Sequence, residues 1–276
     1  MKTVPICLKT VPAAICLLIP AVMCAAADKA VQIVEQREGE TVTLTAKLTN
    51  AIDVTMTLSA DLENLAPSIP LPATIDSDGK TDVPLLTFQV VDRKKPYRYG
   101  YRLEWKPGGR PKGTATAFAY ALPYKDGPRR VRQGFLGRFS HYMGSQDEYA
   151  IDWSMPIGTK VYASRAGTVA AFRSDVDEGG PDPKYKSDYN YIVIRHDDGT
   201  YAEYLHIDSD GVKVHAGDKV SQGQFIGLSG NTGYTSEPHL HFAVFNTVTG
   251  HIRKTIPIEF MLPSGKRIVL QEGRSY

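Results

Sequence analysis

A chain of 276 residues, with 42% hydrophobic and 22% charged residues, has the composition of a globular protein with one large domain or two smaller ones. Its formal net charge is +2, and this charge falls to 0 without residues 1–27, which contain two lysines and no acidic residue. A nearly neutral chain gives no support to nucleic acid or an acidic membrane surface as the main partner.

Residues 1–27 have the layout of a secretory signal peptide. Two lysines precede an apolar run, and three alanines ending at Ala27 provide the small residues of a cleavage site. The run is short for a membrane span and Pro20 interrupts it, so we expect no stable span after cleavage. The predicted location is therefore secreted or periplasmic, and lipoprotein anchoring through Cys24 is the alternative.

All three cysteines of the chain lie inside this predicted leader, at Cys7, Cys16 and Cys24. The mature chain would then have no disulfide, no thiolate ligand for zinc and no cysteine nucleophile.

Residues 28–121 alternate in the manner of β-strands, as in "TVTLTAKL" and "YRYGYRLEW", with turn clusters such as "DSDGK" between them. Short strands at this spacing predict a β-sandwich-like accessory domain. This region contains no histidine. We therefore expect it to serve packing or targeting rather than metal or general-base chemistry.

The segment "ALPYKDGPRR" marks a domain boundary, since two prolines and a charged turn separate the first half from the second. Residues 122–276 continue with short strands such as "NYIVIRH", "TYAEYLHI" and "HLHFAVF", and no window has sustained helical periodicity. The predicted fold class is all-β, with the accessory domain followed by a small, mainly antiparallel β-sheet domain.

The histidines are concentrated in this second half, which holds all seven: His141, His196, His206, His215, His239, His241 and His251. Three of them, His196, His215 and His251, lie among turn residues and charges, where a structural or surface role explains them.

The other four have different neighbours. In "HLHFAVF", a strand places His239 and His241 on the same face. Asp152 lies between two large apolar residues, where a carboxylate is costly unless it is paired or bound to a metal. His141 and His206 complete the set. Three neutral N or O ligands with one open position are typical of a catalytic zinc site.

Three stretches carry a resemblance to a known family: "EYAIDWSMPIGTKVYASRAGTV", "YAEYLHI" and "VSQGQFIGLSGNTGYTSEPHLHF". Together they resemble the zinc-dependent endopeptidases of the lysostaphin and LytM type, family M23, over roughly residues 122–262. The terminal histidine phrase is highly specific for that family.

The resemblance implies that His141, Asp152 and His241 bind one zinc ion and that His206 and His239 are catalytic. One catalytic histidine would assist deprotonation of the attacking water, and the other would stabilise the oxyanion or protonate the leaving amine. The chain contains no H-E-x-x-H helix, so no glutamate of that motif serves as the base.

The sequence departs from the family pattern at two places. Ten residues lie between His141 and Asp152, where the family commonly has three, so a loop must bring the two together. Asp147 is nearer in sequence but lacks the continuation "DWSMPIGT", and we therefore expect Asp152 to be the ligand. Glu237 replaces the usual glycine and is expected to alter the groove rim or a local turn.

The predicted function is a secreted zinc metalloendopeptidase that hydrolyses peptide bonds in bacterial peptidoglycan or another peptide substrate. One alternative is a non-catalytic regulator of cell-wall hydrolases on the same fold. Another is a glycan- or protein-binding module with a structural metal, which would need a fourth protein ligand. The first half could also act as an inhibitory prodomain.

Overall fold

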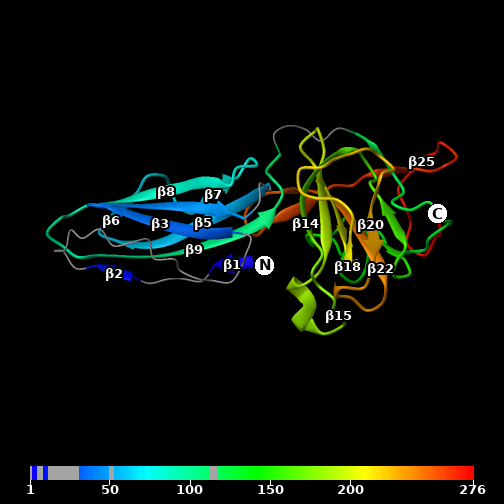
Figure 1. The fold of residues 1–276 in the computed structure, drawn as a ribbon, viewed down its shortest axis with the longest axis horizontal. Helices are drawn as coiled ribbons and strands as arrows, with labels where there is room; N and C mark the ends of the chain where they lie inside the picture. The colour runs from blue at the N-terminus through cyan, green and yellow to red at the C-terminus, as the bar shows by residue number, and fades with distance from the viewer. Residues whose placement is uncertain (1, 5–8, 12–30, 50–52, 112–116) are drawn as a thin grey trace. The chain divides into compact units, whose positions relative to one another are not determined.

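The computed structural model describes residues 2–4, 9–11, 31–49, 53–111 and 117–276 (Figure 1). The predicted cleavage site at Ala27, and Cys24 of the lipoprotein alternative, lie outside these residues. Among the described residues, no helix has the length and apolar character that crossing a membrane requires.

The chain divides into two compact units. Unit 1 comprises Met1–Lys106 and Thr249–His251, and unit 2 comprises Pro107–Val248 and Ile252–Tyr276. The sequence-based boundary between residues 121 and 122 therefore lies within unit 2.

Unit 1 is built from two antiparallel sheets. One sheet contains β1 (Lys2–Val4), β2 (Lys9–Val11), β5 (Val54–Glu63), β7 (Ala73–Asp76) and β9 (Tyr97–Pro107). The other contains β3 (Val31–Glu38), β4 (Thr41–Leu48), β6 (Leu65–Pro67) and β8 (Asp82–Val90).

The two sheets of unit 1 bury their facing side chains. In β4, Val42, Leu44 and Ala46 are buried and alternate with partly exposed threonines, as a strand with one apolar face requires. The ring of Phe88 on β8 lies 5.8 Å from that of Tyr99 on β9, so the core joins the two sheets. Unit 1 is therefore a β-sandwich.

Unit 2 is centred on an eight-stranded antiparallel sheet. Its main path runs through β11 (Val131–Gln133), β12 (Ile151–Ser154), β22 (His239–Thr247), β17 (Tyr201–Leu205), β16 (Tyr191–Arg195), β14 (Gly167–Arg173) and β19 (Lys219–Val220). The last strand, β23 (Arg253–Thr255), also pairs with β22.

Smaller sheets complete unit 2. One contains β13 (Lys160–Tyr162), β18 (Ile207–Val212) and β20 (Phe225–Ser229), and another contains β10 (Ala119–Ala121), β24 (Glu259–Met261) and β25 (Arg267–Ile268). A two-stranded parallel sheet joins β15 (Gly179–Gly180) to β21 (Gly233–Tyr234), and the 3-10 helix η1 spans Pro183–Ser187. No α-helix occurs in the described residues, and the predicted all-β fold class is confirmed.

The central strand β22 separates the core of unit 2 from the histidine-bearing face. Leu240, Phe242 and Val244 belong to the buried hydrophobic cluster, together with Trp153 of β12. Because side chains alternate along a strand, the intervening histidines project from the opposite face.

Candidate metal centre

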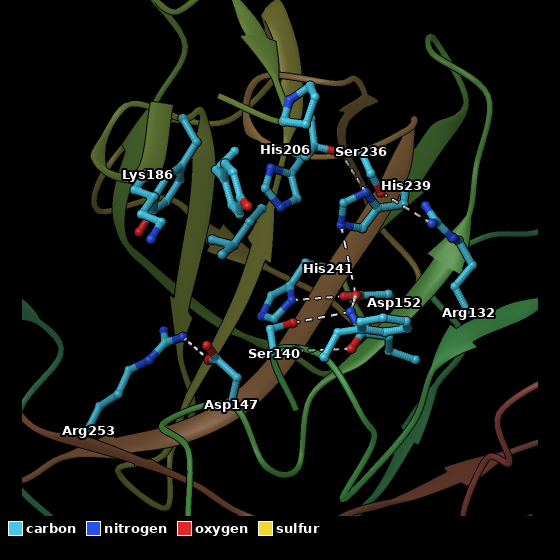
Figure 2. A pocket seen from close by; sticks show the side chains of 17 residues that line it. Arg132, Ser140, Asp147, Asp152, Lys186, His206, Ser236, His239, His241 and Arg253 are labelled. Carbon is cyan, nitrogen blue, oxygen red and sulfur yellow. Dashed lines mark hydrogen bonds and ion pairs between the residues drawn. The ribbon is translucent and has the colours of Figure 1, made fainter. Parts of the chain in front are cut away.

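Two neighbouring strands bring the first candidate ligands together. β12 and β22 pair so that Asp152 lies directly opposite His241. In this register the Nδ1 atom of His241 is 2.9 Å from Oδ1 of Asp152 (Figure 2). The second oxygen of Asp152 accepts a hydrogen bond from Nε2 of Gln133 on β11 at 2.9 Å. The carboxylate is therefore fixed at both oxygens.

The third candidate ligand comes from a loop. His141 lies between β11 and β12 and is fully buried, with Nε2 3.5 Å from Oδ1 of Asp152. The loop folds back on itself, since the backbone N–H of Leu136 donates to the carbonyl of Glu148 and that of Ala150 to the carbonyl of Asp147. This fold closes the ten-residue separation that the sequence leaves between the two side chains.

His141, Asp152 and His241 offer donor atoms that all lie within 4.8 Å of one another. Both ring nitrogens of His141 are buried without a hydrogen-bond partner among the described residues. Buried polar atoms are normally satisfied, so an unpartnered imidazole beside a carboxylate fits a cation as the missing partner. Two imidazoles and one carboxylate form a donor set that suits zinc.

His206 follows β17 and has an unusual backbone conformation. Its φ is +62°, in the left-handed region that few residues other than glycine adopt. Its Nδ1 is 2.7 Å from the carbonyl oxygen of Thr232, so Nδ1 carries the hydrogen and donates it. The other nitrogen, Nε2, is then the one with a lone pair.

The ring of His239 is held by a similar hydrogen bond. Its Nδ1 donates to the carbonyl oxygen of Glu237 at 2.8 Å, and its Nε2 lies 4.0 Å from Oδ2 of Asp152. The ring centroids of His206 and His239 are 4.5 Å apart. The two rings therefore lie side by side, and each has a lone pair on Nε2.

Four of the five residues predicted from the sequence line one cavity of about 760 Å³: Asp152, His206, His239 and His241. The fifth, His141, is buried next to Asp152. Figure 2 shows His206 and His239 above His241 and Asp152 among the side chains that line this cavity. The structure thus brings together all five residues, at the end of the sheet formed by β12, β22 and β17.

The surroundings of these side chains set their protonation states. Burial lowers the pKa of His141 and of His239, and burial with the nearby His239 lowers the pKa of His206 to about 3. Burial alone would raise the pKa of Asp152, but the hydrogen bond and charge of His241, with the other histidines, hold this pKa well below its usual range. Three neutral imidazoles therefore surround one carboxylate at neutral pH.

His241 is the exception among the histidines. Burial opposes its protonation, but the carboxylates of Asp152 and Glu203 raise its pKa to about 10. The site thus attracts positive charge at His241. A metal cation that binds Nδ1 would take the place of that proton.

Gln133, Glu203 and Arg253 belong to the surroundings of the site but were not predicted from the sequence. Glu203 could have been identified from the sequence, because its charge interrupts the apolar run "YAEYL" as Asp152 interrupts the apolar run around it. Gln133 and Arg253 lie in polar stretches of the sequence, which contain no such indication.

The remaining histidines lie elsewhere. His196 is buried, with Nδ1 2.8 Å from the carbonyl oxygen of Ala166. His215 is exposed, and His251 belongs to unit 1, 3.4 Å from Glu104. None of the three lines the cavity.

Glu237 follows Ser236, which lines the cavity, but is not itself a lining residue. Its side chain pairs with Arg132, and its carbonyl oxygen is the acceptor for His239 and for the hydroxyl of Thr235. The residue that replaces the glycine of the M23 pattern therefore contacts no candidate ligand through its carboxylate.

Comparisons with known proteins agree on one family. Residues 146–252 match the model of peptidase family M23. This part of the chain, most of which lies in unit 2, is therefore similar to the M23 peptidases. The match includes Asp152, His206 and both histidines of β22 but begins after His141, so the inclusion of His141 in the site depends on its position in the structure.

Named relatives match part of this chain over part of their own length. The peptidoglycan DD-endopeptidase ShyA of Vibrio cholerae is 44% identical over 91 residues, which are 33% of this chain and 18% of that protein. Lysostaphin of Staphylococcus simulans is 34% identical over 118 residues, 42% of this chain and 22% of that protein. The matched part therefore spans less than a quarter of either relative.

A solved structure of the catalytic domain of lysostaphin from Staphylococcus simulans also matches part of this chain. It is 28% identical, covers 50% of this chain and 86% of that chain, and has a TM-score of 0.29.

Proposed function

We propose that this chain is a zinc metalloendopeptidase that hydrolyses peptide bonds in bacterial peptidoglycan. The observation that carries the proposal is the meeting of His141, Asp152 and His241 within 4.8 Å, beside two further histidines that face the same cavity. The printed names of relatives that act on peptidoglycan support the choice of substrate. Such a substrate lies outside the cytoplasmic membrane, so the proposal includes export by the predicted leader.

In this proposal His141, Asp152 and His241 hold one zinc ion. Zinc at such a site supplies an activated water and polarises the carbonyl group of the substrate. The set provides three protein ligands, as catalytic zinc sites do, whereas structural sites have four. The arrangement therefore favours catalysis over a purely structural metal.

His206 and His239 perform the proton transfers. Both rings donate Nδ1–H to backbone carbonyls, and this fixes their orientation and leaves a lone pair on Nε2. One ring accepts at Nε2 the proton that the attacking water loses, and this same proton then passes to the leaving amine, from that ring or by way of the other. The lowered pKa of each ring keeps both rings neutral, and so able to accept a proton, at neutral pH.

The test combines zinc content with release of new amines from purified peptidoglycan by the full chain. We expect near-stoichiometric zinc and amine release by the wild type. His241→Ala should lose the zinc because it removes one of three ligands. His206→Ala should keep the zinc and lose amine release by roughly 100-fold or more, the usual contribution of a general acid or base.

His215→Ala is the matched control, because His215 is an exposed histidine of the same unit. It should keep both zinc and amine release. Full amine release by His206→Ala would contradict the assignment of that residue. Zinc binding by the wild type without any release would favour a regulator or a non-wall substrate.

A further inference from the structure

Three charged side chains form a group next to His241. Arg253 of β23 pairs through Nη1 with Oε2 of Glu203 on β17 and through Nη2 with Oδ1 of Asp147 in the loop before β12. Figure 2 shows the pair of Arg253 and Asp147 next to His241. We call these residues the Asp147–Arg253–Glu203 triad. They come from three separate segments that the fold brings to one place.

The triad reaches His241 on the side of the ring that faces away from Asp152. Oε1 of Glu203 is 3.5 Å from Nε2 of His241, while Nδ1 of the same ring is 2.9 Å from Asp152. Oε1 and Nε2 are both buried, and neither has a hydrogen-bond partner among the described residues. Each atom is therefore available only to the other, at ion-pair distance.

The cost of burial argues for a role beyond stability. Glu203 is 4% exposed and lies on a strand in the middle of the sheet, opposite Ala243. Charged pairs at such positions are often no more stabilising than apolar residues of the same volume. An apolar side chain at position 203 would suit the sheet, but it would leave Nε2 of His241 buried without a partner.

The triad is not a second cation site. Asp147, Glu203 and His241 do offer donor atoms within 4.8 Å of one another. The guanidinium of Arg253, however, bonds to both carboxylates and already supplies their positive charge. A guanidinium suits this task because it forms directed bonds to two acceptors at once.

When the ring of His241 is neutral, one dication balances the charges around it. Asp147, Asp152 and Glu203 contribute three negative charges and Arg253 one positive charge, which leaves two negative charges in a largely buried region. One divalent cation at the candidate metal centre neutralises them. The triad therefore adds electrostatic attraction for the cation as well as a partner for the ring.

We propose that Glu203, held by Arg253 and Asp147, is a positioning residue for His241. Glu203 accepts from Nε2–H of His241, fixes the tautomer with its hydrogen on Nε2, and so directs the lone pair of Nδ1 to the metal. Partners of this kind orient histidine ligands in metal sites generally. The inference rests on the proposed zinc site, and it concerns residues to which neither the sequence pattern nor the family match gives a role.

The first test measures zinc affinity by competition with a chelating indicator in the full chain. Glu203→Gln keeps the shape and one acceptor but removes the charge, and it should weaken zinc binding by roughly 10- to 100-fold. Arg253→Lys keeps the charge but cannot bond both carboxylates in the same way, so it should weaken binding to a smaller extent.

The control is Asp198→Asn. Asp198 pairs with Arg165 in unit 2, with both side chains nearly buried, and it does not line the cavity. This variant removes the charge of an equally buried acid and should leave zinc affinity unchanged. If it weakened zinc binding as much as Glu203→Gln, a general loss of rigidity would explain both and the positioning role would be wrong.

The second test follows the ring of His241 directly. Nitrogen-15 NMR of the zinc-loaded wild type should report hydrogen on Nε2 and metal on Nδ1, and Glu203→Gln should shift the Nε2 signal. If the wild type binds zinc and Glu203→Gln has the same affinity and the same signals, the positioning role is overturned while the proposed function stands. If the wild type binds no zinc, the proposed function fails, and this inference fails with it.

Discussion

His196 is a buried histidine without a catalytic neighbour. It is 2% exposed and donates Nδ1–H to the carbonyl oxygen of Ala166, and burial lowers its pKa to about 4. The unfolded chain has the ordinary value of about 6.5. Between these two values the unfolded state binds a proton that the native state does not, so stability falls as the pH falls.

We expect His196 to reduce the free energy of unfolding of unit 2 by roughly 3 kcal/mol between pH 7 and pH 4, since one pKa unit corresponds to about 1.4 kcal/mol. Above pH 6.5 both states are neutral and the contribution is constant. Urea unfolding of wild type and His196→Gln at several pH values measures this loss. The variant should have the shallower pH dependence.

His215→Gln serves as the comparison for this prediction, because His215 is exposed in the same unit. It should retain the wild-type pH dependence. Equal slopes for wild type and His196→Gln would show that His196 is protonated as easily in the folded protein as in the unfolded chain.

At the scale of elements, β22 has two faces with different tasks. Its histidines face the cavity, while Phe242 packs in the core against Tyr204 and Trp153, with ring centroids 5.0 and 6.1 Å away. Because both faces belong to one strand, we expect a cavity in the core also to loosen the candidate metal centre.

Phe242→Ala should lower the free energy of unfolding of unit 2 by about 3–5 kcal/mol, the usual cost of removing a buried phenylalanine ring. Urea unfolding checks this value. Phe225→Ala is the matched control, since Phe225 on β20 is 37% exposed. A loss for Phe242→Ala no larger than that for Phe225→Ala would contradict the position of Phe242 in the core.

The alternation of apolar and polar residues was sufficient to predict a strand such as β4, because a strand with one buried face leaves that pattern in the sequence. For β22 the aromatic and β-branched run "HFAVF" was the signal. Because side chains alternate along a strand, the sequence also predicted that His239 and His241 share a face. It could not predict the register that sets Asp152 opposite His241, since strand pairing depends on residues far apart in the chain.

The loop that carries His141 illustrates a second limit. Its conformation depends on turns and backbone hydrogen bonds that follow no periodic pattern. The sequence therefore indicated that a loop must bring His141 to Asp152, but not which path the loop takes. Arg253 illustrates a third limit. Its neighbours in the chain are ordinary surface residues, and its role arises only from the pairing of β23 with β22.

At the scale of the whole molecule, each unit contains one of the two tryptophans. Trp105 lies in unit 1 and Trp153 in unit 2, and both are buried. Their fluorescence therefore reports on the two units separately when either residue is replaced by phenylalanine.

Removal of divalent metal by a chelator should destabilise unit 2 and leave unit 1 unchanged. A ligand present at 100 times its dissociation constant stabilises the folded state by about 2.7 kcal/mol. Thermal unfolding of Trp105→Phe, followed through Trp153, should shift to lower temperature with chelator. Trp153→Phe, followed through Trp105, provides the comparison, and an equal shift in both variants would contradict a metal site confined to unit 2.

Unit 1 includes a short segment from the C-terminal part of the chain. Thr249–His251 join β22 to β23 but count with unit 1, where the N–H of Gly250 donates to Oγ1 of Thr57 at 2.8 Å. A protease that cuts once, after Lys106, therefore produces two fragments that do not correspond to the two units. The longer fragment retains three residues that belong to the fold of the shorter one, so the shorter fragment alone lacks part of unit 1.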